Sequence, residues 1–294
     1  MKKTFLLFLS FFPLCTFAQT AANDSLQTIT ATAVPRLKPF HFITNVPDDM
    51  LQLTKAPFHR KNLKGLVIVA GATAVLLPFD QAITDGVKHL GRQINLDPET
   101  DYRVPIKIGT TKILKVPHNI TSALYQWGEG GTSMMLAGGL FVYGKIKHDR
   151  LALGTASDLT ETFITMGVTT QLIKRISGRQ SPFMSSDEGG FWKPFPSFHD
   201  FETNTSNYDA FPSGHLATMM ATVTTLALNY PGKKWIKPVG YAAMSLTGLA
   251  MINTDVHWIS DYPLALALGY VSAKITYRKN HPHRRTVMIT ENVL

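Results

Sequence analysis

The sequence predicts an all-α fold, a class to which three observations point. Apolar stretches of helix length recur from residue 65 onward, no alternating run of strand length is evident, and no segment repeats. With 294 residues, 45% of them hydrophobic, the chain is long enough to bury the core of one or two domains. The expected helices cover residues 65–79, 130–144, 151–173, 210–232, 238–254 and 262–273.

The first residues of the chain are typical of an export signal. Lys2 and Lys3 are basic, the residues after them are apolar, and the segment ends at Ala18 in a small-x-small pattern. We therefore expect a signal peptide at 1–18. Because Cys15 lies inside it, the mature chain is expected to contain no cysteine, which excludes disulfides, thiol nucleophiles and cysteine metal sites.

The rest of the chain divides into three segments. Residues 19–60 are polar and contain several prolines, so we expect an extended arm or linker. Residues 61–280 hold the helices and form the expected functional domain, and residues 281–294 form a basic C-terminal tail. The net charge is +9, but the basic residues are dispersed without interleaved aromatic residues, so no nucleic-acid partner is expected. This charge favours an anionic membrane surface or an anionic substrate as the partner.

Membrane insertion is expected from the two longest uncharged stretches. A membrane-spanning helix takes about 20 apolar residues, and residues 210–232 and 238–254 meet that length. The mean hydropathy of +0.02, however, is low for a polytopic protein.

The charges of the connections predict an orientation. Basic clusters lie at 145–150 and 233–237 and near the C-terminus, whereas the connection 181–209 is acidic. The positive-inside rule would place the basic clusters in the cytoplasm and Ser213 and His257 on the outer side.

The number of spans does not agree with this orientation. If the signal exports the arm and all the apolar stretches span, both histidines would lie in the cytoplasm. Three solutions are open: residues 65–79 do not span, the bundle is soluble in the periplasm, or the start is not a signal. We prefer the first, because it leaves an outward site and an inward basic tail.

Two histidine motifs carry the expected chemistry. Pro212-Ser213-Gly214-His215 would open a helix and offer backbone N–H groups, a hydroxyl and an imidazole to an anion. His257 is followed four residues later by Asp261, a carboxylate that can orient the imidazole as a nucleophile or base. Together they predict a phosphate site with two histidines in different roles.

Further cations precede these motifs in the chain. Lys174, Arg175 and Arg179 close the stretch 151–173, where they can clamp an anion or simply complement the helix dipole. The polar loop 183–211 that follows can be either a lid over the site or a plain connection. Its candidate cations are Lys193 and His199.

The order of these motifs resembles the type 2 phosphatidic-acid phosphatase superfamily, which includes vanadium haloperoxidases and soluble bacterial acid phosphatases. The superfamily motifs are Lys-x6-Arg-Pro, Pro-Ser-Gly-His and Ser-Arg-x5-His-x3-Asp, and the resemblance covers residues 151–273. It implies a six-helix bundle, embedded in a membrane in the phosphatase branch, and hydrolysis through a phosphohistidine that needs no metal or other cofactor.

The resemblance also implies a role for each matching residue. His257 corresponds to the nucleophile, Asp261 to the carboxylate that orients it, and His215 to the general acid that protonates the leaving group. The phosphate ligands of the family correspond to Lys174, Ser213 and the Gly214 N–H.

Two positions depart from the family pattern. Ser181 stands before Pro182 where the family has arginine, and Met251 replaces the arginine of the third motif. Each lost hydrogen bond to a charged phosphate would cost about 1.5–3 kcal/mol. We therefore hypothesise that Arg179, two residues before Ser181, substitutes as a phosphate ligand.

The expected function is a phosphatase for a phosphomonoester or pyrophosphate, above all of a lipid, in a bacterial-type cell envelope. Its site would face the periplasm from the inner membrane. A soluble periplasmic acid phosphatase and a catalytically impaired module that binds a lipid phosphate or a partner remain alternatives. A vanadium haloperoxidase is disfavoured, because vanadate needs the arginines that are absent. The sequence does not indicate the oligomeric state.

Overall fold

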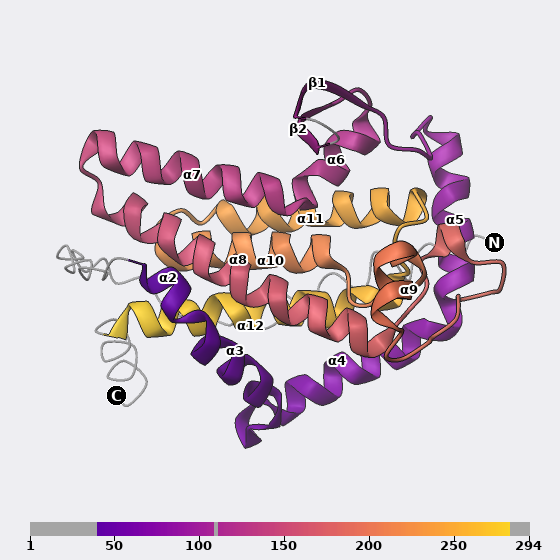
Figure 1. Cartoon of the computed structure of the whole chain (residues 1–294), viewed down its shortest axis with the longest axis horizontal. Helices are drawn as coiled ribbons and strands as arrows, with labels where there is room; N and C mark the ends of the chain where they lie inside the picture. Colours follow the sequence, from indigo (N-terminus) through magenta and orange to yellow (C-terminus); the bar gives the residue numbers. More distant parts are fainter. Residues whose placement is uncertain (1–39, 109–110, 283–294) are drawn as a thin grey trace. The chain divides into compact units, whose positions relative to one another are not determined.

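The core of the structure is a helical bundle with α10 at its centre (Figure 1). The computed structural model describes residues 40–108 and 111–282, without the side chains of 106–108 and 111–114. The predicted signal peptide, the first half of the predicted arm and nearly all of the predicted tail lie outside the described residues. Six helices form the bundle: α6 (Ile120–Gly128), α7 (Gly130–Lys147), α8 (Arg150–Ser177), α10 (Gly214–Asn229), α11 (Ile236–Asn253) and α12 (Tyr262–Asn280).

This arrangement confirms the mostly helical class and the positions of the predicted helices. α10 packs against α8, α11 and α12, and also reaches α6 and α7. Its contact with α12 is close, because a Cβ added to Gly269 would lie 2.3 Å from the Ala217 carbonyl oxygen. α8 begins at Asp149, whose carboxylate accepts hydrogen bonds from the N–H groups of Leu151 and Ala152.

The described part of the predicted arm is helical rather than extended. α2 (His41–Thr44) and α3 (Val46–Lys55) pack against α8, and α3 also contacts α12. The buried residues of α3 are Val46, Asp49 and Leu53, which share one helix face at spacings of three and four. The two short 3₁₀ turns Ala56–Phe58 and Arg60–Asn62 then lead into the next helix.

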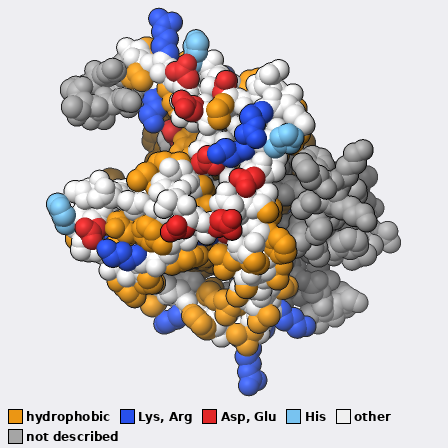
Figure 2. Space-filling view, turned by 90° about the vertical axis from the view of Figure 1, so that its right-hand side faces the viewer, with side chains coloured by type: hydrophobic (Ala, Val, Ile, Leu, Met, Phe, Trp, Pro, Cys, Tyr) orange, Lys and Arg blue, Asp and Glu red, His pale blue; other side chains and the backbone are white. Residues whose placement is uncertain are grey.

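A second helical stretch, α4 (Leu63–Leu76), the turn Leu77–Phe79 and α5 (Asp80–Gln93), runs from α3 to the site. Among the described residues, Arg60–Gln93 is long and apolar enough to cross a membrane by length and composition, and only 6% of its apolar window is buried. This helix includes residues 65–79, the stretch that the preferred arrangement of spans kept out of the membrane, so the structure does not support that preference. α10, with 16 residues, is shorter than the predicted span. Figure 2, which views the right-hand side of Figure 1, shows hydrophobic side chains gathered over the lower half of this face.

A hairpin of β1 (Tyr102–Ile108) and β2 (Thr111–Pro117) interrupts the helices and was not predicted. The first strand does alternate apolar and polar residues, but the run is short and contains Pro105, which weakens a strand pattern. Tertiary contacts secure the hairpin to α6. Tyr102 donates a hydrogen bond to the Ser122 carbonyl, and the Gln126 amide donates one to the Lys115 carbonyl.

Candidate functional site

The last turn of α8 places Lys174 at the site. The helix ends at Gly178, whose φ of 56° is left-handed and where a Cβ would lie 1.8 Å from the Lys193 carbonyl oxygen. Only glycine allows the chain to turn there. Lys174 is buried, and its Nζ lies 3.3 Å from Oδ2 of Asp209, which holds the ammonium group in place.

The N-terminus of α10 meets this lysine. Ser213 caps the helix, accepting a hydrogen bond at Oγ from the Leu216 N–H at 3.5 Å. Its own N–H donates to the carbonyl of Asp261 at 3.1 Å, which ties the second motif to the third. A Cβ added to Gly214 would lie 4.0 Å from Nζ of Lys174. The ammonium and the free N–H groups of the helix end therefore converge, as the phosphate-site prediction requires.

The two motif histidines lie beside this helix end with their rings edge to face, at an interplanar angle of 72°. The His215 and His257 ring centroids are 6.1 Å apart, and the His215 ring also packs against Tyr125 at 4.3 Å. Gly128 permits the close approach of α6, since a Cβ there would lie 2.7 Å from Cβ of His215. His257 is 3% exposed. The two imidazoles thus lie close enough to act on opposite sides of one small group.

The carboxylate of Asp261 lies next to the His257 ring and accepts hydrogen bonds from several donors. Its Oδ2 is 3.4 Å from Nδ1 of His257, longer than the usual N–H···O distance, and Nδ1 has no hydrogen-bond partner among the residues that the structure describes. The same oxygen accepts a hydrogen bond from the Trp258 N–H at 2.8 Å. The carboxylate is therefore in position to hold the imidazole after a small shift in the ring.

The structure places Arg179 behind Asp261, away from the expected phosphate ligands. The side chain is fully buried, with Nη1 2.5 Å from Oδ1 of Asp261 and Nη2 2.5 Å from Oδ2 of Asp80. Nη1 also donates to Oγ of Ser260 at 2.6 Å. Because two carboxylates occupy its two ends, Arg179 supports the orienting carboxylate in this structure and does not reach Lys174.

Asp80 is a site-supporting residue that sequence reasoning missed. It accepts hydrogen bonds from the Ser260 N–H at 3.0 Å and from the Ser260 hydroxyl at 2.6 Å, and it is fully buried. The only signal in the sequence is an acid directly after the apolar stretch 65–79. Nothing in its spacing links it to the histidine motifs.

The other candidate cations do not reach the site. Ser181 and Met251, which stand where the family motifs have arginine, are buried and uncharged. Arg175 packs over the rings of Phe198 and Phe201, and Lys193 pairs with Asp200 at 3.4 Å on the surface. The loop 183–211 is thus docked on the end of α8, partly through α9 (Phe198–Thr203).

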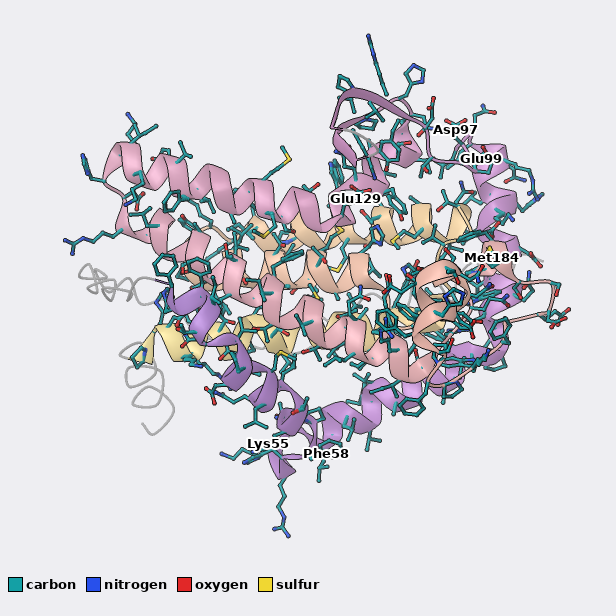
Figure 3. The ribbon with its side chains drawn as sticks, viewed as in Figure 1. Lys55, Phe58, Asp97, Glu99, Glu129 and Met184 are labelled. Carbon is teal, nitrogen blue, oxygen red and sulfur yellow. The ribbon has the colours of Figure 1, made fainter. Side chains whose placement is uncertain are left out.

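Two adjoining cavities open at the site. The first, of about 450 Å³, is bounded by α6, α7, α8 and α10, and the second, of about 650 Å³, lies beside the hairpin. Tyr125 and Glu129 line both, and Figure 3 shows Glu129 where α6 meets α7. Burial, with Glu129 nearby, raises the pKa of Tyr125 to about 12, so its hydroxyl stays protonated near neutral pH. The first cavity is lined by Lys174, Gly214 and His215 among others. The second is lined by residues that include Glu99, Tyr102, Lys115, Thr254 and Val256.

Comparison with known families agrees with this site. Residues 155–285 match the profile of the PAP2 superfamily. The matched segment contains Lys174, the Ser-Gly-His helix end and the His257–Asp261 pair. Over this segment, which is a little less than half of its length, the chain is similar to the type 2 phosphatidic-acid phosphatase (PAP2) superfamily.

Three curated lipid A 1-phosphatases are similar to parts of this chain. A lipid A 1-phosphatase of Porphyromonas gingivalis is 34% identical over 70 residues, covering 24% of this chain and 16% of that protein. The lipid A 1-phosphatases of Rhizobium etli and Rhizobium johnstonii are each 30% identical, over 38% and 37% of this chain and 44% and 41% of their own lengths. The chain thus spans less than half the length of these curated relatives. No solved structure matches it significantly.

Proposed function

We propose that the protein is a phosphatase that hydrolyses a phosphomonoester or pyrophosphate of a lipid. The observation that carries the proposal is the convergence of Lys174 and the N-terminus of α10 on two adjacent histidines. The ammonium and the helix N–H groups would bind the phosphate oxygens, leaving one imidazole on each side of phosphorus.

The reaction would proceed in two displacements. Nε2 of His257 attacks phosphorus and forms a phosphohistidine, while His215 donates its proton to the leaving oxygen. His215, now neutral, then takes a proton from the water that attacks the phosphohistidine and releases phosphate. Asp261 stabilises the positive charge that develops on the imidazole of His257 when the bond forms.

Lipid A 1-phosphate is the first substrate to test. The relatives bear the name lipid A 1-phosphatase. A lipid substrate also suits α4, which is apolar all round and contains no buried residue, with Val67 and Ile68 each 68% exposed. A helix that is apolar on every side, yet exposed, is stable in a bilayer. We therefore propose that the protein resides in the membrane.

The site would face away from the cytoplasm. The basic connections α7–α8 and α10–α11 lie at the left end of the bundle in Figure 1, together with the end of α12. The site and the acidic loop 183–211 lie at the other end. The positive-inside rule then favours a periplasmic site, or its equivalent, on the outer side of the inner membrane.

Phosphate release by the detergent-solubilised protein tests the function. Wild type and His257→Ala are compared on lipid A 1-phosphate, phosphatidic acid and p-nitrophenyl phosphate. We expect release from a lipid substrate that orthovanadate inhibits and that His257→Ala abolishes. A preference for p-nitrophenyl phosphate, with extraction from membranes by carbonate, would instead indicate a soluble acid phosphatase.

The second candidate is a module that binds a lipid phosphate without hydrolysing it. One observation favours it: Ser181 and Met251 leave the site without the two cations of the family motifs. A folded wild type that releases no phosphate from any of the substrates, but binds them, would support this candidate.

A further inference from the structure

The hairpin cavity adjoins the phosphate site through shared walls. Tyr125 and Glu129 line both cavities, and the Tyr125 ring packs on His215 at 4.3 Å between centroids. The hairpin cavity is also lined by Thr254 and by Val256, the residue immediately before His257. A group attached to a phosphate bound at Gly214 would therefore lie next to this cavity.

The lining of the hairpin cavity is polar and aromatic. Lys115 forms an ion pair with Oε1 of Glu129 at 3.4 Å, and its Nζ lies 5.4 Å from the centroid of the Tyr102 ring. Both side chains of this pair are partly exposed, and Glu99 adds a second carboxylate. Carboxylates and a lysine hydrogen-bond hydroxyl groups, and an aromatic ring packs against the apolar face of a sugar.

We propose that this cavity binds the hydroxyl-rich head group of the substrate, such as a glycosyl unit, while its phosphate occupies the neighbouring cavity. The inference rests on the proposed phosphatase function. In it, Glu99 and Lys115 are specificity-determining residues, and Glu129 links the two cavities. The volume of about 650 Å³ has room for a large head group.

The same lining decides between two substrate classes. A pyrophosphate would place its second phosphate beside Glu99 and Glu129, and Lys115 is already paired with one of them. Like charges that lie close together repel each other. A phosphomonoester on a neutral, hydroxyl-rich head group therefore fits this cavity better than a pyrophosphate.

The test compares two lipid phosphates that differ in the head group. Lipid A 1-phosphate carries its phosphate on a sugar, whereas phosphatidic acid carries its phosphate on glycerol and contains no sugar. For Glu99→Gln and Lys115→Ala we expect kcat/KM for lipid A 1-phosphate to fall about tenfold further than for phosphatidic acid, chiefly through KM, as for one lost hydrogen bond. The matched controls Asp101→Asn and Arg103→Ala, whose side chains line neither cavity, should not change this ratio.

The outcomes separate this inference from the proposed function. An equal fall for both lipids, or no fall, would overturn the head-group site. Absence of phosphate release from every substrate by wild type would refute the phosphatase instead. The head-group site then remains testable by titrating lipid A 1-phosphate into His257→Ala. Adding Glu99→Gln should weaken that binding about tenfold, and unchanged binding would reject the cavity.

Discussion

Arg179 supports the carboxylate of Asp261, a role that its position in the sequence did not indicate. The guanidinium joins Asp80 to Asp261, each at 2.5 Å, and all three side chains are fully buried. Two carboxylates around one cation leave a net negative charge, which the hydrogen bonds that the Ser260 N–H and hydroxyl donate to Asp80 help to satisfy. The cluster therefore holds Asp261, which in turn faces His257.

Removing this guanidinium should destabilise the fold. Arg179→Ala would leave two buried carboxylates unpaired, and breaking a buried ion pair costs about 3–5 kcal/mol of unfolding free energy. Arg179→Lys should lose less, although a lysine cannot bridge both acids in a fork. Denaturant unfolding in detergent measures the loss. If Arg179→Ala instead keeps its stability but loses inhibition by orthovanadate, Arg179 is a phosphate ligand after all.

Asp261 should be essential for turnover rather than for substrate binding. Asp261→Asn keeps the shape but removes the charge that stabilises the His257 imidazolium, so we expect kcat to fall at least about a hundredfold. Steady-state kinetics on the preferred lipid measures this fall. Asp255→Asn is the matched control, because Asp255 pairs with Lys88 outside the site and asparagine tolerates its φ of 56°. An equal fall in both variants would refute the specific role.

At the scale of elements, a charge cluster fastens α3 to α12. Nζ of Lys279 lies 2.7 Å from Oδ2 of Asp48 and 2.9 Å from Oδ1 of Asp49. Hydrogen bonds from Lys279 and Gln52 lower the pKa of Asp48. Burial lowers the pKa of Lys279, but the hydrogen bonds to Asp48 and Asp49 outweigh it and raise that pKa overall.

The docking of α3 should therefore depend on pH at both extremes. The Asp48 contribution is complete above 3.8, the pKa of a free carboxyl, and is lost as pH falls through the lower folded pKa. The Lys279 contribution is complete below 10.5 and is lost as pH rises through the higher folded pKa. Lys279→Met should lower the melting temperature between these limits and converge with wild type beyond them.

A neighbouring lysine provides the control for this prediction. Lys274→Met removes the same charge from α12, but Lys274 donates its hydrogen bond to Tyr270 within its own helix. Its melting temperature should follow wild type at each pH. If Lys279→Met and Lys274→Met behave alike, the ion pairs do not fasten α3.

At the scale of the whole molecule, the two ends of the bundle differ in charge. The antiparallel helices bring the basic connections to one end and the site, with its acidic loop, to the other (Figure 1). This separation supports one orientation in a membrane over the reverse.

Cysteine labelling tests the orientation directly. The chain has one cysteine, Cys15, so in a Cys15→Ser background an introduced cysteine is the sole thiol. A membrane-impermeant maleimide applied to intact spheroplasts should label Glu188→Cys in the acidic loop. Lys233→Cys, between α10 and α11, should react only after permeabilisation. The opposite pattern would place the site in the cytoplasm.

The local patterns of the chain predicted its helices and the histidine motifs that meet at the candidate site. Apolar runs mark α7, α8, α10 and α11 within four residues at each end, and they mark the start of α12, which continues past the predicted end to Asn280. Helix formation depends on neighbours three and four positions apart, so local sequence carries this information. The same local geometry carries Ser213, Gly214 and His215, which share one helix start, and His257 with Asp261 four residues on.

Only the tertiary structure decided what surrounds those residues. Arg179 meets Asp80 across 99 positions, and Lys115 meets Glu129 through a hairpin that sequence periodicity did not predict. The helical form of the predicted arm likewise depends on its contacts with α8 and α12. A buried charge takes whichever partner the packing brings within reach, and no spacing along the chain specifies that partner. The sequence thus determined the helical class and the histidine motifs, whereas packing determined which charges support them and which cavities lie beside them.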